Sequence, residues 1–211
     1  MSSNKDWSGN KKSIFKIIGA SNHSDTERET NDFYATEPRA IDALLEYKGI
    51  QLPHVIWEPS CGTGELSKRL IEKGYDVIST DLVDRGYGMG GVNFFEQIAI
   101  PDDCTCILTN PPYKYATEYV KHALSILPED GLLCMFLKTT FAEGQQRYRE
   151  IFSVTPPILI LQCVQRILCA KNADFVGFGS SAVSYAWWIW QKGNYNSPTT
   201  LYWINHNSKQ T

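Results

Sequence analysis

The feature that most constrains the fold is a regular alternation of short apolar runs with helical segments, which starts near Phe33. The apolar runs are rich in Val, Ile, Leu and aromatic residues, a composition typical of buried strands. Strands are predicted at residues 54–59, 75–81, 104–109, 131–138, 158–164, 184–191 and 200–204. Helices are predicted at residues 37–49, 65–74, 114–127 and 143–152. This alternation indicates βαβ units and a buried, mainly parallel sheet.

Two of the predicted strands, 158–164 and 184–191, follow each other without a helix between them. Because antiparallel neighbours need no crossover helix, they predict an antiparallel pair at one edge of the sheet. The expected fold class is α/β: a Rossmann-like, mainly parallel sheet of about seven strands with an antiparallel edge hairpin and helices on both faces. Ligands of such sheets bind at the carboxyl ends of the strands, near the switch point.

The first part of the chain differs in character from the rest. Residues 1–31 are polar and hold several lysines, so we expect a flexible N-terminal arm. Residues 32–211 are expected to form a single domain with one core. No apolar run approaches the ~20 residues of a membrane span, and the N-terminus lacks the apolar stretch of a signal peptide. We therefore expect no membrane contact.

The net charge and the spacing of the cysteines exclude some classes of protein. A net charge of −3 argues against a general polyanion binder, although it leaves room for a local basic strip. The six cysteines are scattered, and the only close pair, Cys104 and Cys106, has neither zinc-type spacing nor a nearby histidine. The expectation is buried, reduced thiols, no metal site and a cytoplasmic protein.

The turn 58-EPSCGTG-64, between the first strand and its helix, predicts a site for a positively charged nucleoside. Its glycines allow close approach of a ligand, but it has neither G-x-G-x-x-G nor a phosphate-binding Gly-Lys-Ser/Thr. Glu58 would repel phosphate and attract a cation, and Asp81, at the end of the next strand, can accept hydrogen bonds from ribose hydroxyls. S-adenosylmethionine, with its ammonium and sulfonium groups, fits both residues. The alternative is an ordinary loop, with Asp81 as a helix cap or a turn residue.

The stretch 110-NPPY-113, directly after an apolar run, predicts chemistry on a planar nitrogen. The exocyclic amine of a purine is a poor nucleophile because its lone pair is delocalised into the ring. The side-chain oxygen of Asn110 and the carbonyl of Pro111 can accept the two amine hydrogens, and the rigid prolines keep these acceptors in place. Tyr113 can stack on the ring. The alternative is a proline-rich loop with Tyr113 as an aromatic cap.

Together these motifs resemble the class I S-adenosylmethionine-dependent methyltransferases, specifically the N6-adenine branch marked by Asn-Pro-Pro-Tyr and its compact phage and mobile-element DNA enzymes. The resemblance covers about Asp32 to Ile204. It implies the catalytic residues Asn110, Pro111, Pro112 and Tyr113. It implies the cofactor-binding residues Tyr34, Thr36, Pro38, Glu58, Ser60, Cys61, Gly62, Gly64, Asp81, Asn93, Phe94 and Asn110.

The resemblance also implies a role for each part of this set. The turn after Glu58 would surround the methionine part of the cofactor, and Asp81 would bind the ribose. Asn93 and Phe94 would frame the adenine, where the family usually has Asp-Phe. Thr36 and Pro38, with Tyr34 nearby, would hold the cofactor carboxylate.

DNA is the favoured substrate, because the overall resemblance is nearest to DNA adenine methyltransferases. RNA adenine and the amide nitrogen of a protein glutamine stay open, since methyltransferases with the same four residues act on both. A non-catalytic cofactor-binding or nucleic-acid-binding module is a further alternative, disfavoured by the intact motif. If the substrate is duplex DNA, the adenine must leave the base stack. Phe141 is a candidate second wall for the base, or else a core residue, and Lys138 a candidate phosphate contact.

A candidate recognition segment spans residues 165–183, and its alternative is a long hairpin loop. It carries four residues suited to phosphate and base contacts, Arg166, Lys171, Phe175 and Phe178. So short a segment suggests a short target or a protein partner that supplies recognition. Lysines of the arm could add contacts to the nucleic-acid backbone: Lys5, Lys11, Lys12 and Lys16.

Overall fold

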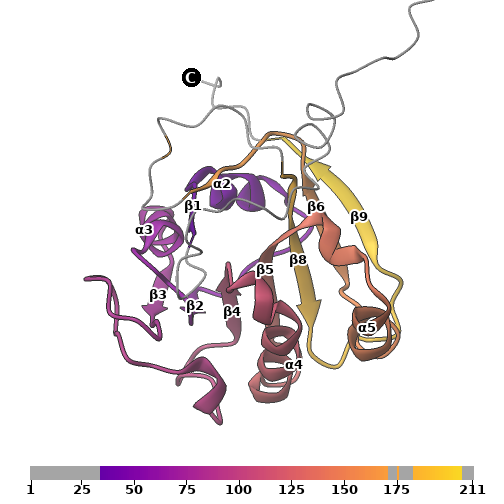
Figure 1. The fold of residues 1–211 in the computed structure, drawn as a ribbon, viewed down its shortest axis with the longest axis horizontal. Coiled ribbons are helices and arrows are strands. Elements are labelled where there is room, and N and C mark those ends of the chain that lie inside the picture. Colours follow the sequence, from indigo (N-terminus) through magenta and orange to yellow (C-terminus); the bar gives the residue numbers. More distant parts are fainter. Residues whose placement is uncertain (1–33, 171–174, 176–182, 206–211) are drawn as a thin grey trace, which may run out of the picture. The chain divides into compact units, whose positions relative to one another are not determined.

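In the computed structural model, the described residues are 34–170, 175 and 183–205. Their centre is a seven-stranded sheet with the order β3-β2-β4-β5-β8-β6-β9 (Figure 1). The strands are β2 (Val55–Glu58), β3 (Asp76–Ser79), β4 (Cys106–Thr109), β5 (Leu132–Lys138), β6 (Leu159–Cys163), β8 (Tyr185–Gln191) and β9 (Thr200–Ile204). All seven lie within the strands predicted from the sequence. The arm predicted at residues 1–31 lies outside the described residues.

The sheet is mainly parallel, as expected. β3, β2, β4 and β5 run parallel to one another, whereas β8 runs antiparallel to both β5 and β6. The predicted antiparallel pairing of residues 158–164 with 184–191 is therefore confirmed. This pair does not end the sheet, however, because β9 adds outside β6 in the parallel sense, with Thr200 opposite Leu159. Since β8 is paired on both sides, the free side of β6 is where the last strand can bond.

Helices cover both faces of the sheet (Figure 1). On one face lie α2 (Arg39–Glu46) and α3 (Glu65–Glu72); on the other lie α4 (Ala116–Ile126) and the π-helical turn Tyr148–Phe152 that follows the short α5 (Gln145–Arg147). None of the described helices is long and apolar enough to cross a membrane.

Alternate residues of each central strand belong to opposite faces. In β4, Cys106 and Leu108 pack with α2 and α3, whereas Ile107 packs with α4. A strand covered on both faces needs apolar residues at every position, which is why it reads as a continuous apolar run. The indole nitrogen of Trp187 on β8 also donates to the carbonyl oxygen of Ala40 at 2.8 Å and so anchors α2.

A second, two-stranded sheet joins β1 (Ala35–Thr36) to β7 (Cys169–Ala170) in the antiparallel sense. Thr36 lies opposite Cys169 in this pair. Strands of two residues leave no periodic signal, so the sequence did not predict them. The pairing brings the start of the domain against the segment that follows β6.

A buried carboxylate ties the two helices of one face together. Asp42 of α2 is 5% exposed and accepts hydrogen bonds from Arg69 of α3, at 2.7 and 2.9 Å. The ammonium of Lys73 lies 2.9 Å from the same carboxylate oxygen. Burial alone would raise the pKa of Asp42, but the two cations outweigh it and lower that pKa.

Candidate active site

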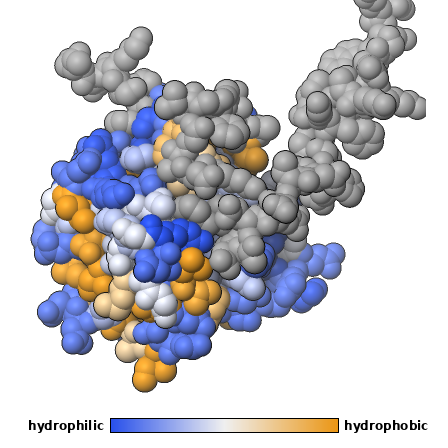
Figure 2. All heavy atoms as spheres, turned by 60° about the vertical axis from the view of Figure 1, so that its left-hand side comes forward, coloured by the Kyte–Doolittle hydropathy of each residue, from blue (hydrophilic) through white to orange (hydrophobic). Residues whose placement is uncertain are grey.

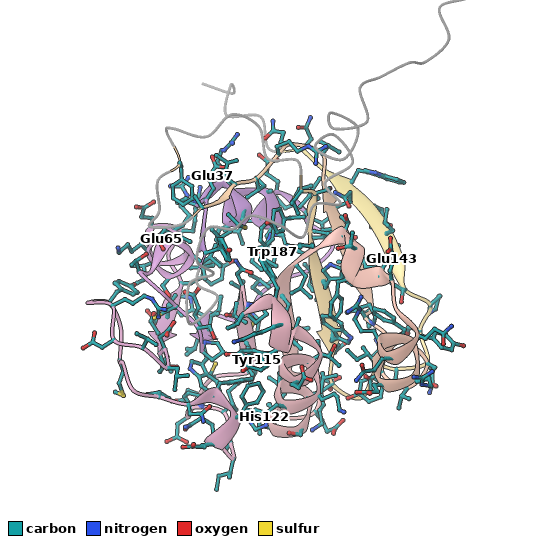
Figure 3. All side chains as sticks on the ribbon, viewed as in Figure 1. Glu37, Glu65, Tyr115, His122, Glu143 and Trp187 are labelled. Atoms are coloured by element: carbon teal, nitrogen blue, oxygen red, sulfur yellow. The ribbon has the colours of Figure 1, made fainter. Side chains whose placement is uncertain are left out.

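A cavity of about 410 Å³ lies at the carboxyl ends of β2, β3 and β4. β3 and β4 lie on opposite sides of β2 in the sheet, so the connections that follow these strands lead away from one another and leave a crevice at this switch point. Glu65 of α3 and Tyr115, just before α4, border the cavity and come from opposite faces of the sheet (Figure 3). The cavity therefore lies where ligands of open α/β sheets bind.

Most of the residues predicted for the site line this one cavity. They are Tyr34, Thr36, Glu58, Ser60, Cys61, Asp81, Asn93, Phe94, Asn110, Pro111, Pro112 and Tyr113. Five predicted residues do not line it: Pro38, Gly62, Gly64, Lys138 and Phe141. Pro38 instead precedes the first turn of α2. Segments far apart in the sequence thus meet in one place.

The two glycines shape the turn after β2 instead of forming the cavity wall. Gly62 has a φ of +57° and donates its backbone N–H to a carboxylate oxygen of Asp81 at 2.8 Å. Gly64 has a φ of +87°, and a Cβ there would lie 2.3 Å from the ring of Tyr87. Both the backbone conformation and the close ring require glycine. The turn is thereby bonded directly to Asp81, the acid that follows β3.

Glu58 lines the cavity as a buried carboxyl group. It is 2% exposed and accepts a hydrogen bond from the Ser67 hydroxyl. Burial raises the pKa of Glu58 to about 8. At neutral pH the side chain is thus largely protonated, which refines the expectation of a standing negative charge. A bound cation would favour its ionisation.

Asp81 holds its carboxylate at the cavity wall through several donors. It is 7% exposed, and one carboxylate oxygen accepts the backbone N–H of Val83 at 2.8 Å and the guanidinium of Arg85 at 2.9 Å. Arg85 also lines the cavity. A ligand with a vicinal diol could reach this oxygen by taking the place of Arg85.

An aromatic group forms another wall. Phe94 is 2% exposed and stacks on Tyr119 of α4, with ring centroids 4.6 Å apart, while His122 meets Phe94 edge-on at 4.9 Å. Tyr119 also hydrogen-bonds the Ser60 hydroxyl at 2.6 Å. Tyr119 was not predicted from the sequence, because only the folded structure brings this helix residue against Phe94. The predicted adenine-framing position is therefore linked to the turn after β2.

Asn93 serves as a cap in this region. Its side-chain oxygen accepts the backbone N–H of Phe95 at 3.1 Å, and its amide nitrogen donates to Glu96 at 2.8 Å. These bonds close the 3-10 turn Phe94–Glu96. Phe95, also missed, lines the cavity and is 39% exposed. Asn93 thus places two aromatic rings at the cavity.

Asn110 presents an acceptor without a donor. Its amide nitrogen donates to the Thr36 hydroxyl at 2.7 Å and lies 3.5 Å from the backbone oxygen of Tyr34. Its side-chain oxygen is buried and accepts no hydrogen bond from the residues that the structure describes. A buried polar atom without a partner costs about 1–3 kcal/mol. Such an atom in a cavity wall is suited to accept a hydrogen from a ligand.

The ring of Tyr113 lies near three other side chains, one of which is Tyr185 of β8, with ring centroids 6.2 Å apart. The ring of Tyr34 lies 24° from parallel to it, with centroids 6.3 Å apart, and the ammonium of Lys138 lies 4.5 Å from its centroid. Burial raises the pKa of Tyr113 above its usual range. Lys138 thus reaches the proposed base-stacking residue, and a base that stacks on this ring would meet the lysine or displace it.

Phe141 lies in the core below the site. It is 7% exposed and meets Trp188 edge-on at 5.3 Å and Phe152 edge-on at 5.8 Å. These contacts favour the core alternative over a second wall for the base. The sequence could not decide between the two, because an aromatic residue after a strand serves either role.

The predicted recognition segment is described only in part. β7 occupies its early part, and Arg166 is exposed while Phe175 is half-buried. Lys171 and Phe178 lie outside the described residues, as do the lysines of the arm. The segment connects two antiparallel neighbours, β6 and β8, as the hairpin alternative required.

Among the described residues, no group of three or more His, Cys, Asp or Glu side chains could hold a metal ion. The six cysteines are free thiols; all are buried except Cys169, which is partly exposed. Burial raises the pKa of Cys61, the thiol that lines the cavity, to about 12. This thiol is thus uncharged at neutral pH.

Apolar side chains are exposed in the connection between β3 and β4, part of which lines the cavity. Figure 2 shows apolar patches between polar groups on the side of α3 and β3. Leu82, which lines the cavity, is 59% exposed, and Met89 and Ile98, in the connection between β3 and β4, are 65% and 95% exposed. Apolar and polar groups are therefore mixed on the surface beside α3 and β3.

No protein-family model matches this chain, and no curated protein matches it. Solved structures do share its fold. A candidate hemolysin from Streptococcus thermophilus has a TM-score of 0.54 at 10% identity, covering 76% of this chain and 66% of its own. The modification subunit of a candidate type I restriction enzyme from Vibrio vulnificus has a TM-score of 0.54 at 13% identity, covering 94% and 51%. A candidate class I S-adenosylmethionine-dependent methyltransferase from Listeria monocytogenes has a TM-score of 0.51 at 12% identity, covering 95% and 72%.

At such identities the likeness shows the fold alone. The three proteins carry different descriptions, as expected when one fold serves several functions. This chain spans about half the length of the Vibrio subunit. The comparisons confirm the Rossmann-like α/β fold class. The chemistry of the site has to be inferred from the residues that line the cavity.

Proposed function

We propose that this protein is an S-adenosylmethionine-dependent methyltransferase that acts on the N6 amine of adenine, with DNA as the favoured substrate. One observation carries the proposal: the side-chain oxygen of Asn110 is buried, has no partner among the residues that the structure describes, and lies at the wall of a cavity that Glu58 and Asp81 also line. An amine hydrogen is the donor that this oxygen lacks. The prolines that follow Asn110 hold the backbone carbonyl of Pro111 close by.

The residues of the cavity fit the cofactor. Its volume of about 410 Å³ lies within the range of about 300–1,000 Å³ that is usual for small-molecule sites. Asp81 would accept the ribose hydroxyls, Glu58 would favour the positively charged end, and Phe94 would pack beside the adenine. S-adenosylmethionine, when bound, supplies a methyl group on a positively charged sulfur. The fold shared with the Listeria methyltransferase supports the same assignment.

The residues of this chain would prepare the target nitrogen. Asn110 and the Pro111 carbonyl would accept its two hydrogens, which draws the nitrogen toward a tetrahedral state with an available lone pair. Tyr113 would stack on the ring and fix its plane, a contact worth about 1–3 kcal/mol on aromatic–base platforms. The proton released after transfer would pass to solvent, since a neutral amide cannot take it. The protein thus acts by orientation and electrostatics.

The substrate is a nucleic acid in this proposal. Lys138, beside Tyr113, supplies positive charge where a backbone phosphate would pass. The fold shared with a restriction-system modification subunit supports a nucleic-acid substrate and a protein partner that supplies target recognition. We place the protein in the cytoplasm, since its thiols are free. A non-catalytic role is disfavoured, because the sequence Asn110 to Tyr113 is intact and the Asn110 oxygen, which has no partner among the described residues, lies at the cavity wall.

The test uses the purified chain with methyl-labelled S-adenosylmethionine and, separately, duplex DNA, total RNA and cell-extract protein. Labelled polymer is digested and the modified unit identified. N6-methyldeoxyadenosine is the expected product. Label in RNA adenosine or in protein glutamine would support methyl transfer to a planar nitrogen but contradict DNA as the substrate. Failure to bind the cofactor at all would overturn the proposal.

A further inference from the structure

The amide nitrogen of Asn110 is surrounded by three acceptors from outside its own loop. They are the Thr36 hydroxyl at 2.7 Å, the Tyr34 carbonyl at 3.5 Å and the Cys169 sulfur at 3.9 Å. A carbonyl oxygen can only accept, so the Tyr34 carbonyl selects the amino end of the amide. The oxygen end is then left for the opposite side, where it has no described partner.

This orientation decides whether Asn110 can assist methyl transfer. Half a turn about the bond to the amide exchanges oxygen and nitrogen with almost no change in shape. In the reversed orientation the substrate amine would meet a second donor in place of an acceptor. The nitrogen lone pair would then be engaged by that donor and unavailable for attack. Something must therefore hold the amide one way round.

A hydroxyl can donate as well as accept, so it is the Tyr34 carbonyl that selects the amino end of the amide, and Thr36 is placed to hold the amide in that orientation. Thr36 makes the shortest of the three contacts, is 3% exposed, and its strand β1 is held by the pairing with β7, where Thr36 lies opposite Cys169. We infer that Thr36 is a positioning residue for the proposed methyl transfer, on which this role depends, and that it orients Asn110 instead of binding the cofactor carboxylate. The hydroxyl oxygen that the family resemblance assigns to the cofactor is already an acceptor for Asn110.

A pair of substitutions separates the hydroxyl from the shape of the side chain. Thr36→Val keeps the branched shape and removes the oxygen, whereas Thr36→Ser keeps the oxygen. Thr36→Val should lower kcat about tenfold at saturating cofactor, the effect of losing one hydrogen bond, while the Kd of S-adenosylhomocysteine stays within about twofold. Thr36→Ser should recover most of kcat. Thr199→Val, which removes a hydroxyl bonded to Pro157 away from the cavity, is the matched control.

A second readout does not need turnover. The side-chain NH₂ signals of Asn110 in the ¹⁵N spectrum are assigned by their absence from Asn110→Ala. They should exchange slowly with water in the wild type and Thr36→Ser, and at least about tenfold faster in Thr36→Val.

Two results would overturn the role of Thr36. One is a raised Kd for S-adenosylhomocysteine with unchanged kcat in Thr36→Val, which would make Thr36 a cofactor ligand. The other is unchanged exchange of the Asn110 amide in that variant. If the wild type transfers no methyl group while the exchange effect is present, the proposed function fails and the orientation by Thr36 stands.

Discussion

Replacing Glu58 by Gln tests whether the cavity holds a neutral carboxyl group. Glu58 is 2% exposed, and burial raises its pKa from 4.5 to about 8. As pH rises from 4.5, the unfolded chain ionises Glu58 while the folded protein keeps it protonated. This group's stabilisation is therefore fully present below pH 4.5 and is lost progressively up to about pH 8. At about 1.4 kcal/mol per pH unit, the loss reaches roughly 5 kcal/mol.

Glutamine resembles the protonated carboxyl group and does not titrate. The free energy of unfolding of Glu58→Gln minus that of the wild type should therefore rise by about 1.4 kcal/mol for each pH unit between pH 5 and 7. Urea unfolding of both proteins at several pH values measures the difference, in which the other titrating groups cancel. A difference that stays constant with pH would mean that Glu58 is ionised in the folded protein, and the reasoning from burial would be refuted.

Three further predictions concern Glu58, Arg85 and Asp42. Binding of S-adenosylmethionine at pH 7 should release up to about one proton from the wild-type protein, whereas Glu58→Gln should release none from this site. Calorimetry in two buffers of different ionisation enthalpy measures the protons released, and equal release by the two proteins would contradict the prediction. Arg85→Ala should tighten S-adenosylhomocysteine binding about three- to tenfold, because the ligand no longer displaces Arg85 from Asp81, whereas weaker binding would make Arg85 a ligand contact. Asp42→Asn should lower the free energy of unfolding by about 2 kcal/mol at pH 7, since it leaves Arg69 without its buried partner. Because the pKa of Asp42 is lowered in the folded protein, this deficit should begin to shrink as pH falls below about 4 and should be lost as pH falls through that lowered pKa. Urea unfolding of both proteins at pH 3 and 7 measures the change, and an equal deficit at the two pH values would contradict it.

The parts of the fold that the sequence predicts are those set by local pattern. Strands buried on both faces, such as β4 and β5, are continuous apolar runs, and the turn after Glu58 carries its glycines within seven residues. The motif from Asn110 to Tyr113 is contiguous as well. Its position at the end of a central strand follows from the alternation of strands and helices alone.

What the sequence could not predict depends on contacts between distant residues. Thr36 and Asn110 are 74 residues apart, and they meet only because strands of two residues pair. The raised pKa of Glu58 needs the burial that the surrounding elements create together. Phe141 could serve the site or the core until Trp188 was placed beside it. In each case the missing information was tertiary.

The most direct test of the central claim is methyl transfer by Asn110→Ala, measured beside cofactor binding. Transfer to the acceptor that the wild type modifies should fall about 100- to 1,000-fold, as when one preorganised catalytic hydrogen-bond group is lost, while the Kd of S-adenosylhomocysteine changes little. Asn194→Ala, which removes an amide bonded to Gln191 away from the cavity, should keep wild-type transfer. Undiminished transfer by Asn110→Ala would contradict the account, because the unpartnered oxygen would then have no part in the reaction.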